Sequence, residues 1–193
     1  MLAGGSSRRM GLDKAFVKIR GIEMLKRIVD QVYDLVGEMI VVIDQKGDSD
    51  KYRDLIPREV RVINDLESGQ NPLLGVHSGL STVQSKYALL IPCDTPFLNR
   101  KIIQLIFEKS DQHQAAVPRW PDGRIEPLMS VYRAEDGLAA VKKLLGTRSN
   151  SMNDFVGSLT DVVFIRTESL RRIEGNLLTF TNVNTPEDLR KLS

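Results

Sequence analysis

The sequence has almost no cysteine or histidine, and this scarcity excludes several kinds of site. Cys93 is the only cysteine, so no disulfide can form within the chain. His77 and His113 are the only histidines and lie far apart in the sequence, so no zinc-site spacing is present. Both features favour a reducing, intracellular compartment.

Long apolar runs are absent as well. No run approaches the roughly 20 residues that a helix needs to cross a bilayer, and the first residues lack the apolar centre of a secretory signal. We therefore expect a soluble, cytoplasmic protein with no membrane partner. The formal net charge is only +2, which gives no indication of a nucleic-acid partner, so any phosphate must be bound by a local group of charges.

What the sequence does contain is the pattern of a single α/β domain. Its 193 residues, 41% of them hydrophobic and 27% charged, suit one globular domain with a sizeable core. Short apolar runs alternate with segments whose apolar residues recur at helical spacing, which favours a mostly parallel sheet with crossover helices. The expected strands are 39–43, 60–63, 87–91, 115–117, 128–132, 162–165 and 178–180. The expected helices are 22–36, 74–83, 99–109, 134–145, 151–159 and one that begins at Pro186.

Polar residues stand where several of these strands end. They are Asp44, Asp65, Asp94 and Asn182. In open α/β sheets ligands bind beyond the carboxyl ends of the strands. We therefore expect these side chains, together with the glycine-rich beginning of the chain, to line one ligand site.

The beginning of the chain has the composition of a phosphate-binding loop. Two adjacent glycines, Gly4 and Gly5, allow the backbone to turn tightly and bring its N–H groups close to an anion. Arg8, Arg9 and Lys14 add positive charge within the same short stretch. The spacing matches neither a Walker A loop nor a G-x-G-x-x-G fingerprint. The alternative for this segment alone is a flexible, positively charged arm.

Asp94 follows the apolar run 87–91 within the sequence Pro-Cys-Asp-Thr-Pro. A carboxylate at the end of a buried strand is well placed to hold Mg²⁺, which takes one or two protein carboxylates and completes its shell with phosphate and water. The alternative is a strand-ending turn, since Asp and Pro both favour turns. Cys93 has no evident base beside it, which indicates a small buried apolar residue rather than a nucleophile.

Two further segments carry polar side chains of interest. Asp65 ends a strand and is a candidate for nucleotide or metal binding, although a polar turn is favoured when this segment is taken alone. Asn182 and Asn184 carry amides that can pair with the polar edge of a pterin. Thr185 and Asp188 also have the spacing of a helix cap, which does not use either asparagine.

Taken together, these segments resemble the molybdenum cofactor guanylyltransferase family, within the wider nucleotidyltransferases related to sugar-nucleotide synthases. The family's opening L-A-G-G-x-S-x-R-M-G-x-D-K is matched from Leu2 to Lys14 with one additional arginine. Its strand-end Asp-Thr-Pro is matched from Asp94, and its closing N-x-N-T-P-E-[DE]-L is matched from Asn182 to Leu189. The order and approximate spacing hold over the whole chain.

The resemblance implies a role for each of these residues. Lys14 would contact the phosphates and, with Arg9 and Asp94, form the catalytic group, in which Asp94 would coordinate Mg²⁺. Asn182 and Asn184 would face the acceptor. The other residues of the implied nucleotide site are Leu2, Ala3, Gly4, Gly5, Asp44, Asp65 and Gly75.

The family has a single Rossmann-like, three-layer α/β domain that transfers GMP from GTP to the phosphate of molybdopterin. The resemblance therefore implies GTP, molybdopterin and Mg²⁺ as ligands, a monomer or weak homo-oligomer, and molybdoenzyme-delivery proteins as possible partners. The alternatives are a relative that uses CTP, or one whose acceptor is phospholactate or cobinamide phosphate. An alternative of another class is a non-catalytic nucleotide-binding module that delivers cofactor. The doubled glycine favours GTP, and the asparagine-rich ending favours molybdopterin.

One departure from the family pattern concerns the first strand. Relatives carry a hydrophobic strand before the Leu-Ala-Gly-Gly turn, whereas here Met1 stands directly before it. We expect about five residues of this central strand to be missing from the single domain 1–193, judging from the usual strand length. Without that strand the glycine-rich loop would lose part of its anchor.

Overall fold

The carboxyl ends of several parallel strands meet at one edge of this fold. In the computed structural model, which describes residues 1–4, 13–67, 69, 71–147, 151–185 and 187–188, β3 (Ile40–Ile43) pairs in parallel with β4 (Arg61–Asn64). All of β3 is buried, as expected for a continuous β-branched run. Leu2 forms parallel bridges to both Val42 and Pro92, so the beginning of the chain lies between β3 and the segment that follows β5.

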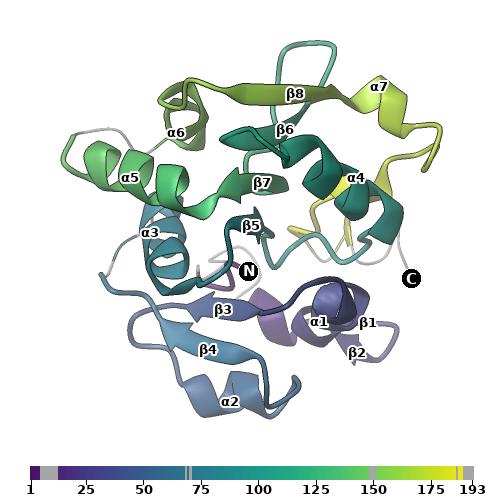
Figure 1. The fold of residues 1–193 in the computed structure, drawn as a ribbon. Coiled ribbons are helices and arrows are strands. Elements are labelled where there is room, and N and C mark those ends of the chain that lie inside the picture. The colour runs from purple at the N-terminus through teal and green to yellow at the C-terminus, as the bar shows by residue number, and fades with distance from the viewer. Residues whose placement is uncertain (5–12, 68, 70, 148–150, 186, 189–193) are drawn as a thin grey trace.

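A second group of strands is mixed. Its order is β5 (Tyr87–Leu90), β7 (Ser130–Arg133), β6 (Ala115–Arg119) and β8 (Val162–Arg166). β7 runs antiparallel to both of its neighbours, and β6 and β8 are parallel. Figure 1 shows these strands above β3 and β4, with the N-terminus between the two groups. The expected α/β class is confirmed, with β7 as the antiparallel member.

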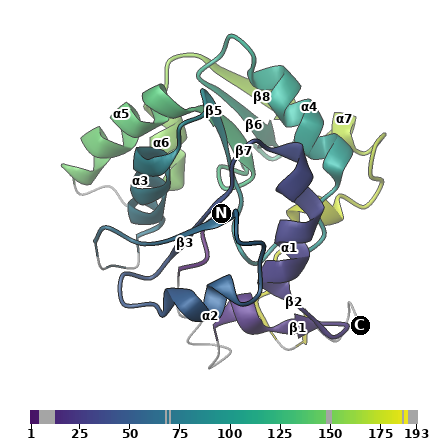
Figure 2. The same cartoon turned by 60° about the horizontal axis from the view of Figure 1, so that its bottom comes forward.

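Helices cover both faces of the sheet and make it the middle of three layers. Figure 2 shows α3, α5 and α6 on one face and α1 and α4 on the other. In α1, the residues Met24, Leu25, Ile28, Val29 and Val32 are buried at helical spacing, so one stripe of the helix packs on the sheet. The bounds of the five helices are α1 Met24–Val32, α3 Pro72–Thr82, α4 Arg100–Ser110, α5 Ala134–Leu145 and α6 Met152–Gly157.

Most expected elements are present, and the caps explain where several helices begin. Asn99 accepts a hydrogen bond from the Lys101 N–H (3.0 Å) at the start of α4, as expected. Ser151 caps α6 in the same way. Helix α3 begins earlier than expected, because Asn71 caps it and Pro72 occupies its first turn.

Two expectations about secondary structure are wrong. The helix expected over 22–36 covers only Met24–Val32. Ile22–Glu23 instead forms strand β2, which pairs with β1 (Lys18–Ile19), and a 3₁₀ helix follows Val32. The segment expected as strand 178–180 is a 3₁₀ helix, Leu178–Phe180, entered through Leu177 in the left-handed region (φ 52°). The remaining short elements are η1 Lys14–Phe16, η2 Tyr33–Leu35, α2 Ser49–Arg53 and α7 Thr167–Leu170.

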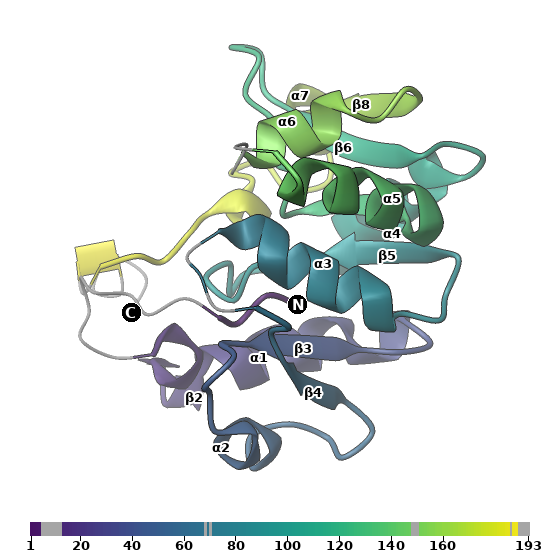
Figure 3. The ribbon, with the colours of Figure 1, turned by 90° about the vertical axis from the view of Figure 1, so that its left-hand side faces the viewer.

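The parallel strands bring the polar residues that follow them to one edge. Asp44 follows β3, Asp65 follows β4, and Asp94 lies beyond β5. Figure 3 shows the C-terminal segment, in yellow, crossing the same side of the molecule. The helix expected from Pro186 lies largely outside the described residues. Among the described residues, none of the helices has the length and apolar character of a membrane span.

Candidate active site

Lys14 is the centre of the site because its ammonium group joins two distant segments. It begins the 3₁₀ helix η1, which Asp13 caps by accepting a hydrogen bond from the Ala15 N–H (3.0 Å). Lys14 Nζ lies 3.0 Å from Asp94 Oδ2 and 2.5 Å from Asn184 Oδ1. The structure therefore unites three of the site residues expected from the sequence, one each from the beginning, middle and end of the chain.

One carboxylate oxygen of Asp94 accepts a hydrogen bond, and the other has no partner among the described residues. Oδ2 accepts from Lys14, and the side chain is only 18% exposed. Oδ1 is buried and has no hydrogen-bond partner among the residues that the structure describes. An unpaired buried carboxylate oxygen costs free energy until a donor or cation reaches it, so this atom is suited to a positively charged ligand.

Cys93, beside Asp94, takes no part in this chemistry. Its thiol is buried, and burial together with the neighbouring Asp94 carboxylate raises its pKa to about 12. Such a thiol stays protonated at neutral pH, and thiolate is the nucleophilic form. Cys93 is thus a buried apolar residue, as expected.

The C-terminal segment is fixed to Asp94 through its backbone. The Val183 N–H donates to the Asp94 carbonyl (2.8 Å), which places Asn184 beside Lys14. The Asp188 carboxylate accepts from the Asn184 and Thr185 N–H groups, both at 2.9 Å, and Thr185 Oγ1 accepts from the Asp188 N–H (3.1 Å). This reciprocal pattern confirms the expected cap. Asn182 is exposed and lies outside the Lys14 cluster.

The first residues of the chain approach β3 closely. Ala3 N–H donates to the Val42 carbonyl (2.8 Å), and Leu2 N–H donates to the Ile91 carbonyl (2.8 Å). A Cβ atom at Gly4 would lie 2.8 Å from Asp44 Oδ1 and 3.1 Å from the Asp44 nitrogen, so a side chain here would have to displace Asp44. Gly4 and Asp44 are thus neighbours. Gly5, Arg8 and Arg9 lie outside the described residues.

Asp65, Gly75 and Leu2 lie close together. The Asp65 N–H donates to the Ile43 carbonyl (2.8 Å), and its carboxylate accepts a hydrogen bond from the Ser78 hydroxyl. A Cβ atom at Gly75 would lie 3.2 Å from Leu2 Cδ2 and 3.8 Å from Asp65 Oδ2. The expected nucleotide residues Leu2, Asp65 and Gly75 therefore form one contiguous group.

Three supporting residues were not expected from the sequence. Asn64 Nδ2 lies within hydrogen-bond distance of the carbonyls of Asp44 (3.1 Å) and Gly47 (2.8 Å), which fixes the loop that carries Asp44. Ser78 holds Asp65, and Tyr52 donates a hydrogen bond to Asp13. The only sequence signal for Asn64 was its position next to Asp65, and the other two contacts are long-range with no local pattern.

Comparison with known proteins extends this picture. The family model described as MobA-like NTP transferase domain matches residues 1–163. A probable molybdenum cofactor guanylyltransferase of Methanosarcina acetivorans is 35% identical, over 100% of this chain and 88% of that protein. A molybdenum cofactor guanylyltransferase of Syntrophotalea carbinolica is 32% identical, over 99% of this chain and 88% of that protein.

A solved structure has the same fold. It is molybdopterin-guanine dinucleotide biosynthesis protein A from Archaeoglobus fulgidus, with a TM-score of 0.83, 22% identity, and coverage of 99% of this chain and 94% of that one. At this identity the structural likeness establishes the fold alone. It places the three-layer arrangement of this chain among solved α/β folds.

Proposed function

The chain belongs to the family of MobA-like NTP transferase domains, and from this membership we propose that it transfers GMP from GTP to the terminal phosphate of molybdopterin. The products are molybdopterin guanine dinucleotide and pyrophosphate. The observation that carries the proposal is the cluster of Lys14, Asp94 and Asn184, with Lys14 Nζ 3.0 Å from one and 2.5 Å from the other. The cluster supports the proposal because the Lys14 ammonium would bind phosphate between the nucleotide and the acceptor.

The reaction forms one P–O bond and breaks one. An oxygen of the acceptor phosphate attacks the α-phosphorus of GTP, and the bond from this phosphorus to the β-phosphate oxygen breaks, releasing pyrophosphate. The nucleophile is already an anion near neutral pH, so no general base is required. The protein supplies position and charge neutralisation, for which Lys14 is the described cation nearest Asp94.

The residues present fit a divalent cation. Asp94 Oδ1 is a buried carboxylate oxygen without a hydrogen-bond partner within the described part of the chain. No three His, Cys, Asp or Glu side chains of the described residues gather in a metal-binding group, so Asp94 would hold Mg²⁺ together with phosphate oxygens and water, a usual arrangement for this ion. The ion would neutralise the charge that develops on the phosphates.

The nucleotide would occupy the edge formed by Leu2, Gly4, Asp44, Asp65 and Gly75. Because Gly4 and Gly75 have no Cβ, Asp44 packs closely against the first and the Leu2 side chain against the second. Two carboxylates would accept hydrogen bonds from the ribose or the base. They are the exposed carboxylate of Asp44 and that of Asp65, which Ser78 fixes through a hydrogen bond.

The decisive experiment is incubation of the purified protein with GTP, Mg²⁺ and molybdopterin, followed by product identification by mass and measurement of pyrophosphate. We expect the guanine dinucleotide and one pyrophosphate for each product formed. CTP in place of GTP is the matched control. Preferential transfer of CMP would overturn the guanylyl assignment, and the absence of pyrophosphate with every nucleotide would favour a binding module.

A further inference from the structure

A carboxylate that the phosphoryl-transfer mechanism does not use is held rigidly at the same edge of the sheet. Glu126 comes shortly before β7, and its N–H donates to the Pro118 carbonyl (3.0 Å). Its carbonyl accepts from the Met129 N–H (3.0 Å) and from Ser130 Oγ (2.6 Å). Its side-chain Oε1 accepts from the Trp120 indole Nε1–H at 2.6 Å. Both the backbone and the carboxylate are therefore fixed in place.

Trp120, which holds this carboxylate, is itself fixed by packing. Its ring meets Phe180 edge to face, with centroids 5.9 Å apart and an interplanar angle of 75°. The Arg124 guanidinium lies over the same ring, 5.4 Å from its centroid. An indole held on two sides keeps its N–H aimed at Glu126, so the pair forms a rigid polar and aromatic surface.

This surface lies at the same end of the strands as the Lys14 cluster. Leu90 of β5 is the register partner of Ser130 of β7. Asp94 follows Leu90 in the chain and Glu126 precedes Ser130, so both extend beyond the same end of this strand pair. The segment from Phe180, which touches Trp120, to Val183, which bonds Asp94, spans at most about 10 Å. That reach suits a fused-ring acceptor with its phosphate at Asp94 and its rings toward Trp120.

Resting on the proposed function, we infer that the Glu126 carboxylate reads the pyrimidine edge of the pterin in the acceptor. A pterin presents two adjacent donors there, a ring N–H and an exocyclic amino group. A carboxylate offers two oxygens with about four acceptor sites and matches such a pair in a two-point contact. The bond from Trp120 uses one of these sites and orients the others. Glu126 is thus a specificity residue of the acceptor site.

The environment of Glu126 is consistent with this role. Burial raises the pKa of its carboxyl, while the Trp120 hydrogen bond and the Arg124 charge oppose the rise. A half-buried carboxylate forms stronger hydrogen bonds to a bound ligand than one in water. The competing explanation is structural: the Trp120–Glu126 bond simply closes the connection between β6 and β7.

Ligand pairs that differ by one donor separate these explanations. The probes are hydroxymethylpterin phosphate and the matching hydroxymethyllumazine phosphate, in which an oxo group replaces the exocyclic amino group. We expect the wild-type protein to bind the pterin at least tenfold more tightly, the scale of a lost hydrogen bond to a charged group. Glu126→Gln should abolish this preference, because an amide N–H would face the pterin donors or only one acceptor would remain.

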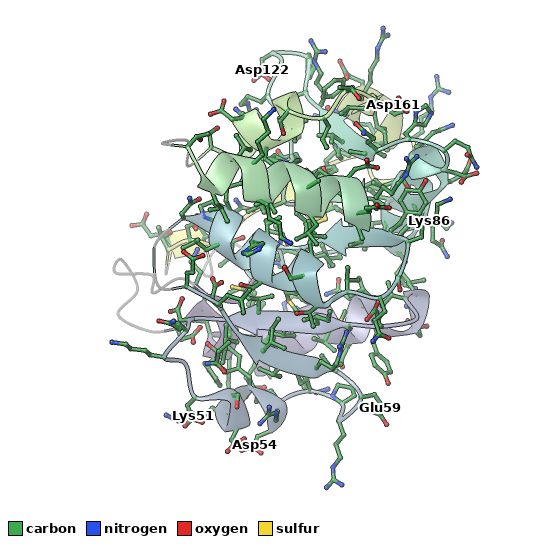
Figure 4. All side chains as sticks on the ribbon, turned by 60° about the vertical axis from the view of Figure 1, so that its left-hand side comes forward. Lys51, Asp54, Glu59, Lys86, Asp122 and Asp161 are labelled. Atoms are coloured by element: carbon green, nitrogen blue, oxygen red, sulfur yellow. The ribbon has the colours of Figure 1, made fainter. Side chains whose placement is uncertain are left out.

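Two further variants keep the test independent of folding. Trp120→Phe keeps the ring but removes the indole N–H, so the preference should fall part of the way. Glu59→Gln makes the same chemical change at an exposed site, and Figure 4 shows Glu59 at the lower end of the molecule, away from Asp122 near the β6–β7 connection at the top. This control should leave the ratio unchanged. Calorimetry with each probe supplies the dissociation constants, and thermal melting verifies the fold.

The two levels of proposal fail in different ways. A wild-type protein that makes no dinucleotide from GTP and molybdopterin overturns the proposed function. An unaltered preference for pterin over lumazine in Glu126→Gln, or no preference in the wild type, overturns the inference about Glu126 and leaves guanylyl transfer standing. A purely structural role would lower melting temperature without moving the ratio of the two dissociation constants.

Discussion

Lys14 and Asn184 are 170 positions apart in the chain, yet Lys14 Nζ lies 2.5 Å from Asn184 Oδ1. The same ammonium group lies 3.0 Å from Asp94 Oδ2. Because the lysine and aspartate side chains are only 15% and 18% exposed, water screens their interaction incompletely. In the proposed site, this charge would lie between the two substrates and would interact with both.

The first prediction concerns the two charged members of this cluster. Lys14→Ala and Asp94→Ala should each lower kcat by two orders of magnitude or more, since each removes charge stabilisation of the transferring phosphates. Pyrophosphate release under saturating GTP and acceptor measures this loss. The control is Lys51→Ala, an exposed lysine of α2, which should turn over normally. Normal turnover by Asp94→Ala with Mg²⁺ present would refute the metal assignment.

A second prediction follows from the close approach of Gly4 to Asp44. Gly4→Ala should weaken GTP binding about tenfold, because its Cβ would lie 2.8 Å from Asp44 Oδ1 and force the chains apart. Gly37→Ala is the matched control, as nothing lies within 4 Å of the added atom. Dissociation constants from calorimetry measure the effect.

A double variant assigns the Gly4 effect to the Asp44 side chain. Asp44→Ala removes the closest atom, so its cost to GTP binding should be smaller in the Gly4→Ala background than in the wild type. Strict additivity of the two changes would show that the Asp44 carboxylate is not the obstacle. GTP binding of Gly4→Ala at wild-type affinity would refute the proposed path of the nucleotide.

The sequence predicted elements well where periodicity and capping agreed. Helix α4 was expected from Asn99, and its cap bond to Lys101 is present. Strand β3 was expected from its apolar run, and it is buried throughout. Both signals are local, since a cap needs only the next few residues and a buried strand needs only continuous apolar side chains.

The failures came where a tertiary contact overrode the local pattern. The segment 178–180 has apolar residues typical of a strand, but Leu177 before it adopts a left-handed conformation, which interrupts an extended backbone. The Thr179 hydroxyl also accepts a hydrogen bond from the Asn99 N–H (2.9 Å), a contact from a distant part of the chain. Position at a strand end was enough to predict that Asp65 and Asp94 lie at one edge of the sheet. Ser78, which holds Asp65, lies within a helix and had no signal of its own.

A third prediction concerns the amino group of Met1. It is buried and donates to the Ile40 carbonyl (2.6 Å), and burial lowers its pKa from 8.0 to about 5. Between these values the unfolded chain binds more protons than the folded one, so the free energy of unfolding should rise as pH increases from 5 to 8. The gain is at most about 4 kcal/mol. Urea unfolding across this range measures it.

Acetylation of the same amino group provides the control for this titration. An acetylated chain has no ammonium group to desolvate, so the contribution of Met1 to the slope should vanish while other titrations persist. Equal slopes for the free and acetylated chains between pH 5 and 8 would show that the Met1 amine is solvated in the folded protein.

The last prediction concerns the space on the amino side of Met1. A cavity of about 280 Å³ lies there, lined by Met1 itself, by Ile40 of β3 and by Tyr87 and Leu89 of β5. Because Leu2 bridges Val42 and Pro92 in parallel, residues added before Met1 would continue between β3 and β5 along this cavity. We propose that this cavity accepts an added strand.

Extension of the chain tests this proposal directly. Five added residues rich in Val and Ile should pair with both neighbouring strands, bury several apolar side chains and raise Tm on the order of 10 °C. They should also remove the Met1 contribution to the pH slope, since the amine becomes an amide. An extension of equal length made of Gly, Ser and Pro cannot form the ladder and should leave Tm near that of the unextended chain. Equal melting temperatures for the two extensions would show that the cavity does not accept a strand.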